Sequence, residues 1–313
     1  MCLGEIVLTP TERLVDTNGV TLKVLEAGER GNPVVVLTHG FPELAYSWRH
    51  QIPVLADAGY HVLAPDQRGY GGSSRPEGIE AYNIVELTAD IAGLLDDVDA
   101  EQAILIGHDW GSPVATNFPL FFPDRVRAVA ALSVPPVPRA PGPPTQIWRR
   151  IFGDNYFYIL HFQEPGVADA QLGADPRHSL RRSLAMQGIG EPLETLADQP
   201  LPPLPDWISA DEFEHYVEAF TEKGFTGPLN WYRNFDRNWE LTESTPASTI
   251  TAPVLFLAGT ADPVLSFTPS DRVGDVATGD YREVLIEGAG HWLQQERPDE
   301  VNKVLLEFLG GLK

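Results

Sequence analysis

The chain has 313 residues, 43% of them hydrophobic, which suffices for one large domain or for a domain that carries a substantial insertion. Its formal net charge of −22 disfavours nucleic acid and anionic membrane surfaces as partners through Coulomb repulsion. Cys2 is the only cysteine, which excludes an intrachain disulfide and a thiolate-metal cluster. Neither a secretory leader pattern nor an apolar run of about 18 residues is present, so we expect a cytoplasmic protein without stable membrane association.

An opening hairpin is followed by alternating strands and helices. Residues 13–16 and 20–24 flank an Asn18-Gly19 pair, which favours a tight turn between two strands. In the next helical stretch, Asn83 and Glu86 have the spacing of a capping box and predict a helix that begins at Ile84. The alternation predicts βαβ units and a mostly parallel sheet, with strands at 34–38, 61–65, 103–107 and 126–134.

A different kind of sequence begins at Pro135. Six prolines between Pro135 and Pro144 forbid a regular helix or a central strand there, and the following hundred residues contain helical fragments and many aromatics. Strand-like sequence returns at 253–258 and 282–286, before a final amphipathic helix. We therefore predict an α/β core formed by residues 1–134 and 249–313, and a helical cap formed by residues 135–248.

Asp109 has the sequence context of a nucleophile elbow. The apolar run 104–106 predicts a buried strand, and Gly107 and Gly111 flank Asp109 with the small-x-nucleophile-x-small spacing of such an elbow. A carboxylate at this point suits attack on saturated carbon, because the resulting alkyl ester carries its only electrophilic carbonyl on the enzyme side. Taken alone, an Asp at this position is more often a helix N-cap than a nucleophile.

Candidates for the partners of this nucleophile follow later strands. His291 follows a strand and the Gly288-Ala289-Gly290 turn, which predicts a base at the carboxyl edge of the sheet. Asp262 follows another strand, and the order nucleophile, acid, histidine is that of the α/β-hydrolases. Taken singly, Asp262 is more often a turn or cap residue and His291 a loop histidine, but the combination favours a catalytic triad. The backbone N–H groups of Phe41 and Trp110 are candidate oxyanion donors.

Other chemistries have weaker support in the sequence. Gly69-Tyr70-Gly71-Gly72-Ser73 lacks both a complete Gly-x-Gly-x-x-Gly pattern and a Walker lysine, so we interpret it as a flexible loop rather than a phosphate site. The eight histidines show no spacing typical of zinc ligands, so no metal is expected. Pro119 should kink or shorten the helix after the elbow at about its second turn.

These motifs resemble the α/β-hydrolase-fold epoxide hydrolases of the soluble type, over nearly the whole chain from His39 onward. The resemblance implies an α/β-hydrolase fold, a mostly parallel sheet with helices on both faces and a helical cap. It also implies that Tyr158 and Tyr232 are lid donors, with Tyr156 an alternative to Tyr158 if the local register differs. The core motifs of the resemblance are His39-Gly40-Phe41-Pro42 and the segments 66–71 and 107–111, which dehalogenases share in variant form. The lid segments 162–166 and 227–234 are more specific to this family.

The resemblance also implies a mechanism without cofactor or metal. Asp109 attacks an epoxide carbon while Tyr158 and Tyr232 donate to the oxygen, and His291, oriented by Asp262, then activates the water that hydrolyses the ester. The expected partners are a small apolar epoxide and water, and the chain is expected to be a monomer or a homodimer. The alternatives are a haloalkane dehalogenase with the same nucleophile and, from another class, a non-catalytic small-molecule-binding protein on a hydrolase scaffold.

Overall fold

Eight strands form one sheet in the order β1-β2-β4-β3-β5-β6-β7-β8. The computed structural model describes residues 9–187, 191–197 and 199–312; Cys2 and the rest of the segment before residue 9 lie outside the described residues. The pairs β1–β2 and β2–β4 are antiparallel, and all the other neighbouring strands are parallel. The strands are Thr11–Thr17, Val20–Ala27, Val34–Thr38, His61–Pro65, Ala103–His108, Val126–Leu132, Val254–Gly259 and Tyr281–Ile286 for β1 to β8.

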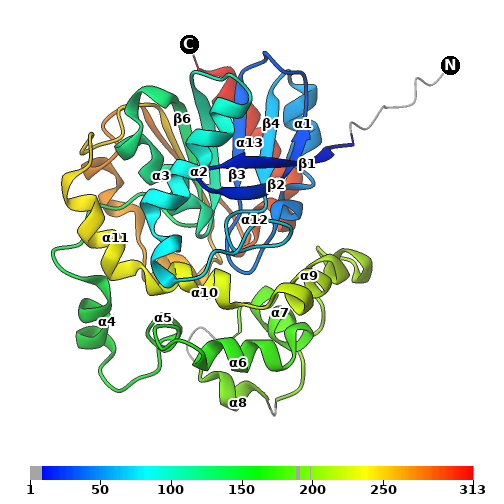
Figure 1. The fold of residues 1–313 in the computed structure, drawn as a ribbon, viewed down its shortest axis with the longest axis vertical. Helices are drawn as coiled ribbons and strands as arrows, with labels where there is room; N and C mark the ends of the chain where they lie inside the picture. Colours follow the sequence, from blue (N-terminus) through cyan, green and yellow to red (C-terminus); the bar gives the residue numbers. More distant parts are fainter. Residues whose placement is uncertain (1–8, 188–190, 198, 313) are drawn as a thin grey trace.

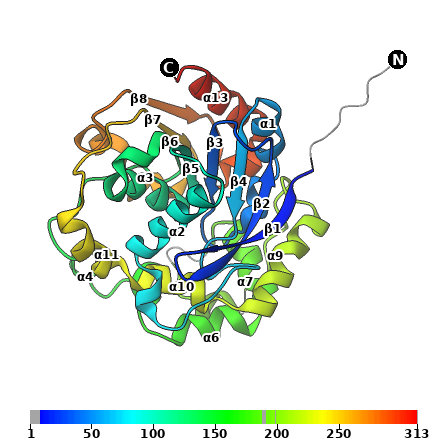
Figure 2. The same ribbon diagram turned by 45° about the horizontal axis from the view of Figure 1, so that its top comes forward.

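Helices cover both faces of this sheet, as the predicted βαβ pattern requires (Figures 1 and 2). Along β3, Val34 and Val36 face a core shared with α2 (Ile84–Asp97) and α3 (Gly111–Phe121). Val35 and Leu37 face the opposite core, shared with α1 (Ile52–Asp57), α12 (Leu293–Glu296) and α13 (Pro298–Gly310). Strands buried on both faces are expected to be apolar throughout, which is why their sequences show no alternation.

Local sequence signals set several element boundaries. Asn18 and Gly19 adopt φ of 45° and 74°, as a tight hairpin turn requires, and β1 pairs with β2 as predicted. The Asn83 side chain accepts hydrogen bonds from the N–H groups of Val85 and Glu86 and starts α2 at Ile84. The predicted capping box is wrong in its second half, because the Glu86 carboxylate accepts instead from the Asn18 amide, 3.0 Å away.

Two predicted boundaries differ from the structure. Strand β6 ends at Leu132 rather than at residue 134, because Ser133 adopts a φ of 69° and turns the chain out of the extended conformation. Helix α3 continues through Pro119 to Phe121, so Pro119 does not end the helix at its second turn. The proline lacks the N–H that would bond to the preceding turn, yet the packing of α3 against β5 and β6 retains the helix.

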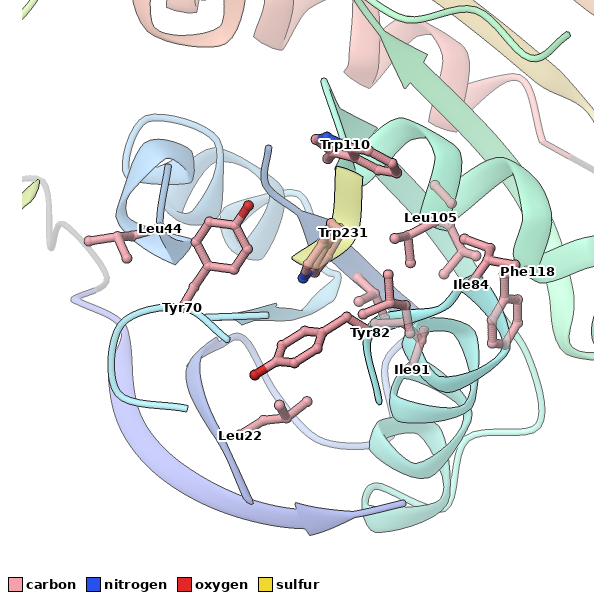
Figure 3. Packing of buried hydrophobic residues seen from close by; sticks show 14 of the residues in the cluster. Leu22, Leu44, Tyr70, Tyr82, Ile84, Ile91, Leu105, Trp110, Phe118 and Trp231 are labelled. Atoms are coloured by element: carbon pink, nitrogen blue, oxygen red, sulfur yellow. The ribbon is translucent and has the colours of Figure 1, made fainter. Parts of the chain in front are cut away.

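The segment between β6 and β7, which we call the helical insertion (residues 133–253), gathers at one end of the sheet (Figure 1). Trp231 fastens it to the rest of the fold: its indole N–H donates to the Arg68 carbonyl at 3.0 Å, and its ring meets Trp110 and Tyr70 edge-on (Figure 3). The helices are Pro144–Phe152, Tyr158–His161, Val167–Ala174, Pro176–Leu184, Leu193–Ala197, Ala210–Lys223, Thr226–Arg233 and Phe235–Leu241 for α4 to α11.

Candidate active site

Asp109 lies on a tight turn between β5 and α3. Its φ is 49°, a left-handed conformation that non-glycine residues rarely adopt and that often marks functional sites. A Cβ on Gly107 would overlap the Gly111 carbonyl, and a Cβ on Gly111 would overlap the carbonyl of Thr38. The two flanking glycines of the motif are therefore required by close packing of backbone against backbone.

The loop after β3 brings a hydrogen-bond donor onto this carboxylate. The Phe41 N–H donates to Asp109 Oδ1 at 2.8 Å, and a Cβ on Gly40 would overlap the Asp109 side chain. His39 holds the loop: its Nδ1 lies 2.9 Å from the Gly40 carbonyl and its Nε2 accepts from Gln67 N–H at 3.0 Å. Trp110, the other expected donor, occupies the N-cap position of α3, directly after Asp109.

The three residues of the expected triad come together at the carboxyl edge of the sheet. His291 Nε2 lies 3.6 Å from Asp109 Oδ2, and His291 Nδ1 lies 3.1 and 3.2 Å from the two carboxylate oxygens of Asp262. The Val264 N–H donates to Asp262 Oδ1 at 2.9 Å and orients that carboxylate. The imidazole thus stands between two carboxylates that arrive from different strands.

The two carboxylates control the ionisation of the imidazole. Burial opposes a charge on His291, but attraction to Asp262 and Asp109 outweighs it and raises the pKa of His291 to about 10. Burial likewise opposes ionisation of Asp109 and Asp262, yet their interactions with His291 hold the pKa of each carboxyl below its ordinary value. In the free site, all three groups are therefore charged at neutral pH.

Two tyrosines of the helical insertion line the same pocket as Asp109 and His291. Tyr158, the first residue of α5, and Tyr232, in α10, lie with ring centroids 6.0 Å apart in an edge-to-face arrangement. Burial and the nearby Asp109 charge raise the pKa of both phenols, so both are protonated at neutral pH. The other lining residues are Phe41, Pro42, Phe162, Leu172, Ser183, Met186, Gln187, Leu193, Val264 and Trp292. Tyr156, the alternative to Tyr158, is not among them.

The sequence reasoning missed a buried polar network behind the triad. Glu43 accepts from His108 Nδ1 at 2.7 Å, and His108 Nε2 donates to the backbone carbonyl of His291 at 2.8 Å. Glu43 also accepts from the side-chain amides of Gln294 and Gln295, which follow His291 closely in the chain. The sequence indicated this network only through His108, a histidine directly before Asp109. Nothing in the sequence around Glu43 indicated that its carboxylate takes part.

Ser133 is the second residue that sequence reasoning missed. It is fully buried, its Oγ lies 2.5 Å from Asp262 Oδ2, and the same oxygen lies 2.9 Å from His291 Nδ1. Its position directly after β6 was a usable signal, since the residues that follow β5, β7 and β8 also meet at this edge.

The described residues offer no metal centre: among residues 9–187, 191–197 and 199–312, no group of three or more His, Cys, Asp or Glu side chains is placed to hold an ion. Over the same part of the chain, no helix has the length and apolar character that crossing a membrane requires.

Comparisons with known proteins agree with this fold. Residues 33–298 match the model of the α/β-hydrolase fold family. The chain is 64% identical to epoxide hydrolase A of Mycobacterium tuberculosis over 97% of this chain and 98% of the relative. It is 36% identical to epoxide hydrolase 3 of Siraitia grosvenorii over 94% of this chain and 96% of the relative. The crystal structure of epoxide hydrolase A from Mycobacterium thermoresistibile superposes with a TM-score of 0.93 at 61% identity, covering 97% and 99% of the two chains.

The mostly parallel sheet and the family match define an α/β-hydrolase. Within that class, the similarity over nearly the full length of several relatives is decisive: the chain belongs to the epoxide hydrolases of the α/β-hydrolase fold family. The prediction of an epoxide hydrolase is thereby confirmed, whereas the haloalkane dehalogenase and the non-catalytic binding protein receive no support from the comparisons.

Proposed function

We propose that this enzyme converts an epoxide and water to a vicinal diol through a hydroxyalkyl ester on Asp109. The observation that carries the proposal is the juxtaposition of Asp109 with His291 on one side and with a pocket lined by Tyr158 and Tyr232 on the other. An ionised carboxylate, a base that activates water and two protonated phenols are the groups that this chemistry needs.

In the first step, Asp109 attacks an epoxide carbon and the carbon–oxygen bond of the ring breaks. Tyr158 and Tyr232 hold the epoxide oxygen, and one of them transfers its proton as the alkoxide develops, leaving a tyrosinate. The lowered pKa of Asp109 keeps the nucleophile ionised at neutral pH, while the raised pKa of each phenol keeps the proton available.

Ester formation changes the charge around His291. Asp109 becomes neutral, so one of the two carboxylates that hold the pKa of His291 at about 10 loses its charge. The imidazolium then releases its proton, which returns to the tyrosinate and regenerates the phenol. His291 thereby becomes a neutral base only after the ester has formed.

In the second step, His291 takes a proton from a water molecule, which attacks the Asp109 carbonyl carbon. The N–H groups of Phe41 and Trp110 stabilise the tetrahedral oxyanion; the Phe41 N–H already lies 2.8 Å from Asp109 Oδ1. Collapse of this intermediate breaks the bond to the alkyl oxygen, which takes the proton of the Asp109 carboxyl group and leaves as the diol. Asp109 and imidazolium His291 are restored.

Different parts of the chain supply the triad and the two phenols. We propose an α/β-hydrolase core of residues 1–134 and 249–313 that supplies the triad, and a cap of residues 135–248 that supplies the two phenols. The apolar side chains of the pocket favour a small apolar epoxide as substrate. We further propose that the enzyme acts in the cytoplasm, as a monomer or a homodimer.

Product analysis with an aryl-substituted terminal epoxide tests this function. We expect the vicinal diol as the product, and no halide release when a chloroalkane of similar size replaces the epoxide. The double variant Tyr158→Phe/Tyr232→Phe should form the diol about 10²–10⁴-fold more slowly. Halide release without diol formation would contradict the proposal and support the dehalogenase alternative.

A further inference from the structure

Ser133 contacts both members of the acid–base pair from a third strand. It is the first residue after β6, which lies between β5 and β7 in the sheet, so its side chain enters the site between Asp109 and Asp262. Its Oγ lies 2.5 Å from Asp262 Oδ2 and 2.9 Å from His291 Nδ1. Both distances are those of hydrogen bonds, and the residue is fully buried.

The positions of the protons follow from the chemistry of the three groups. An ionised carboxylate only accepts hydrogen bonds, so the Ser133 hydroxyl donates to Asp262, and its oxygen lone pairs face His291 Nδ1. His291 Nδ1 is then surrounded by three oxygen acceptors, which retain the proton on Nδ1. This arrangement leaves Nε2 of the neutral imidazole as the basic atom, on the side of Asp109.

The backbone of Ser133 is held in a conformation that favours glycine. Its φ is 69°, while its N–H donates to the Leu257 carbonyl at 2.9 Å. Glycine would occupy this turn without strain, so the turn itself gives no reason for a hydroxymethyl side chain. The reason for the side chain is instead the contact of its hydroxyl with Asp262 and His291.

We propose that Ser133 is a positioning residue for ester hydrolysis, whose hydroxyl fixes the Asp262 carboxylate against His291 and limits how strongly that carboxylate holds the imidazolium proton. The inference rests on the proposed role of His291 as the base. The Val264 N–H donates to Oδ1 of Asp262 and Ser133 donates to Oδ2, so each carboxylate oxygen has one donor other than the imidazole.

Loss of the hydroxyl concentrates negative charge on Asp262 Oδ2, one of the two carboxylate oxygens that lie within 3.2 Å of His291 Nδ1. The imidazolium is then held more strongly, and a smaller fraction of His291 is the neutral base at neutral pH. Removing the Ser133 hydroxyl leaves the other charged or titratable groups near His291 in place. These groups are Asp109, which is neutral in the ester, His108 with its partner Glu43, and Tyr158.

The test is single-turnover kinetics of Ser133→Ala across a range of pH. We expect ester formation to stay within about twofold of the unsubstituted enzyme, because Asp109 and the phenols are untouched. Ester hydrolysis should slow roughly tenfold at neutral pH, with its pH profile shifted by about one unit to higher pH, since one pKa unit corresponds to a tenfold change in the neutral fraction. The ester should accumulate, so kcat and KM should fall together.

Two further variants separate the hydroxyl from the backbone. Ser133→Gly also removes the hydroxyl, but glycine adopts the positive φ without strain. We therefore expect the same shift of the pH profile and a higher Tm than that of Ser133→Ala. Ser112→Ala removes another buried hydroxyl, one that donates to the Val134 carbonyl at 2.5 Å and is not bonded to the triad. Its pH profile should match that of the unsubstituted enzyme.

The inference is overturned if Ser133→Ala leaves the pH profile of ester hydrolysis in place, whatever the change in rate or stability. It is also overturned if Ser133→Gly restores hydrolysis at neutral pH, because the strain and not the hydroxyl would then explain the effect. Failure of the proposed function gives a different result, in which no covalent ester forms in any variant, His291→Gln included.

Discussion

Replacing Tyr232 or Tyr158 by Phe removes one donor to the epoxide oxygen and retains the ring packing. The two rings meet edge-to-face, and Tyr232 also packs against Trp110, so phenylalanine preserves most of the buried contact. A hydrogen bond to a developing charge contributes about 1.5–3 kcal/mol, so each single variant should slow ester formation roughly 10- to 150-fold. The double variant has no proton donor for the epoxide oxygen, so its rate of ester formation should fall by about 10²–10⁴-fold.

The rate of ester formation can be followed by stopped-flow tryptophan fluorescence. Trp110 directly follows the nucleophile, and Trp292 lies with its ring 4.6 Å from the His291 ring, so both indoles report on the site. Tyr156→Phe is the matched control: its hydroxyl is buried, has no hydrogen-bond partner among the described residues and does not line the pocket. Ester formation should be unchanged in that control. Undiminished ester formation in the double variant would refute the assignment of the phenols.

Three further predictions concern the base and the core. His291→Gln should form the ester on Asp109 and fail to release it, so mass spectrometry of the quenched protein should find the adduct; rapid turnover would contradict this. The pKa of His291 is raised from 6.5 to about 10, so the stability it contributes is complete below pH 6.5 and is lost as pH rises toward 10. The decline of Tm between pH 6.5 and 10 should therefore be smaller in His291→Gln, and an equal decline would refute the charge assignment. Arg68 makes a bidentate pair with buried Asp90, so Arg68→Met should lower the free energy of unfolding in urea by about 3–5 kcal/mol, and a loss below about 1 kcal/mol would contradict it.

The sequence was most informative where local chemistry decides the structure. The strands could be predicted because residues buried on both faces of a sheet are uniformly apolar, and the elbow because only glycine fits beside Asp109 at positions 107 and 111. The order of Asp109, Asp262 and His291 along the chain predicted contacts that the structure brings within 3.6 Å.

Long-range pairings outside the triad were beyond sequence reasoning. Glu43 lies 65 residues from its partner His108, and nothing in a single chain indicates that the two side chains meet beneath His291. Ser133 was within reach through its position alone, since it directly follows β6. Serine after a strand is common in turns, so the residue type added nothing to that signal. Pro119 misled because tertiary packing keeps α3 helical where local propensity predicts a break.

A single turnover in water labelled with ¹⁸O tests the ester on Asp109 most directly. With enzyme in excess over the epoxide, each active site reacts once, and the water oxygen enters the carbonyl carbon that it attacks. We expect the label in the peptide that contains Asp109 and none in the diol. Label in the diol, with none in Asp109, would show direct attack of water on the epoxide and contradict the proposed mechanism.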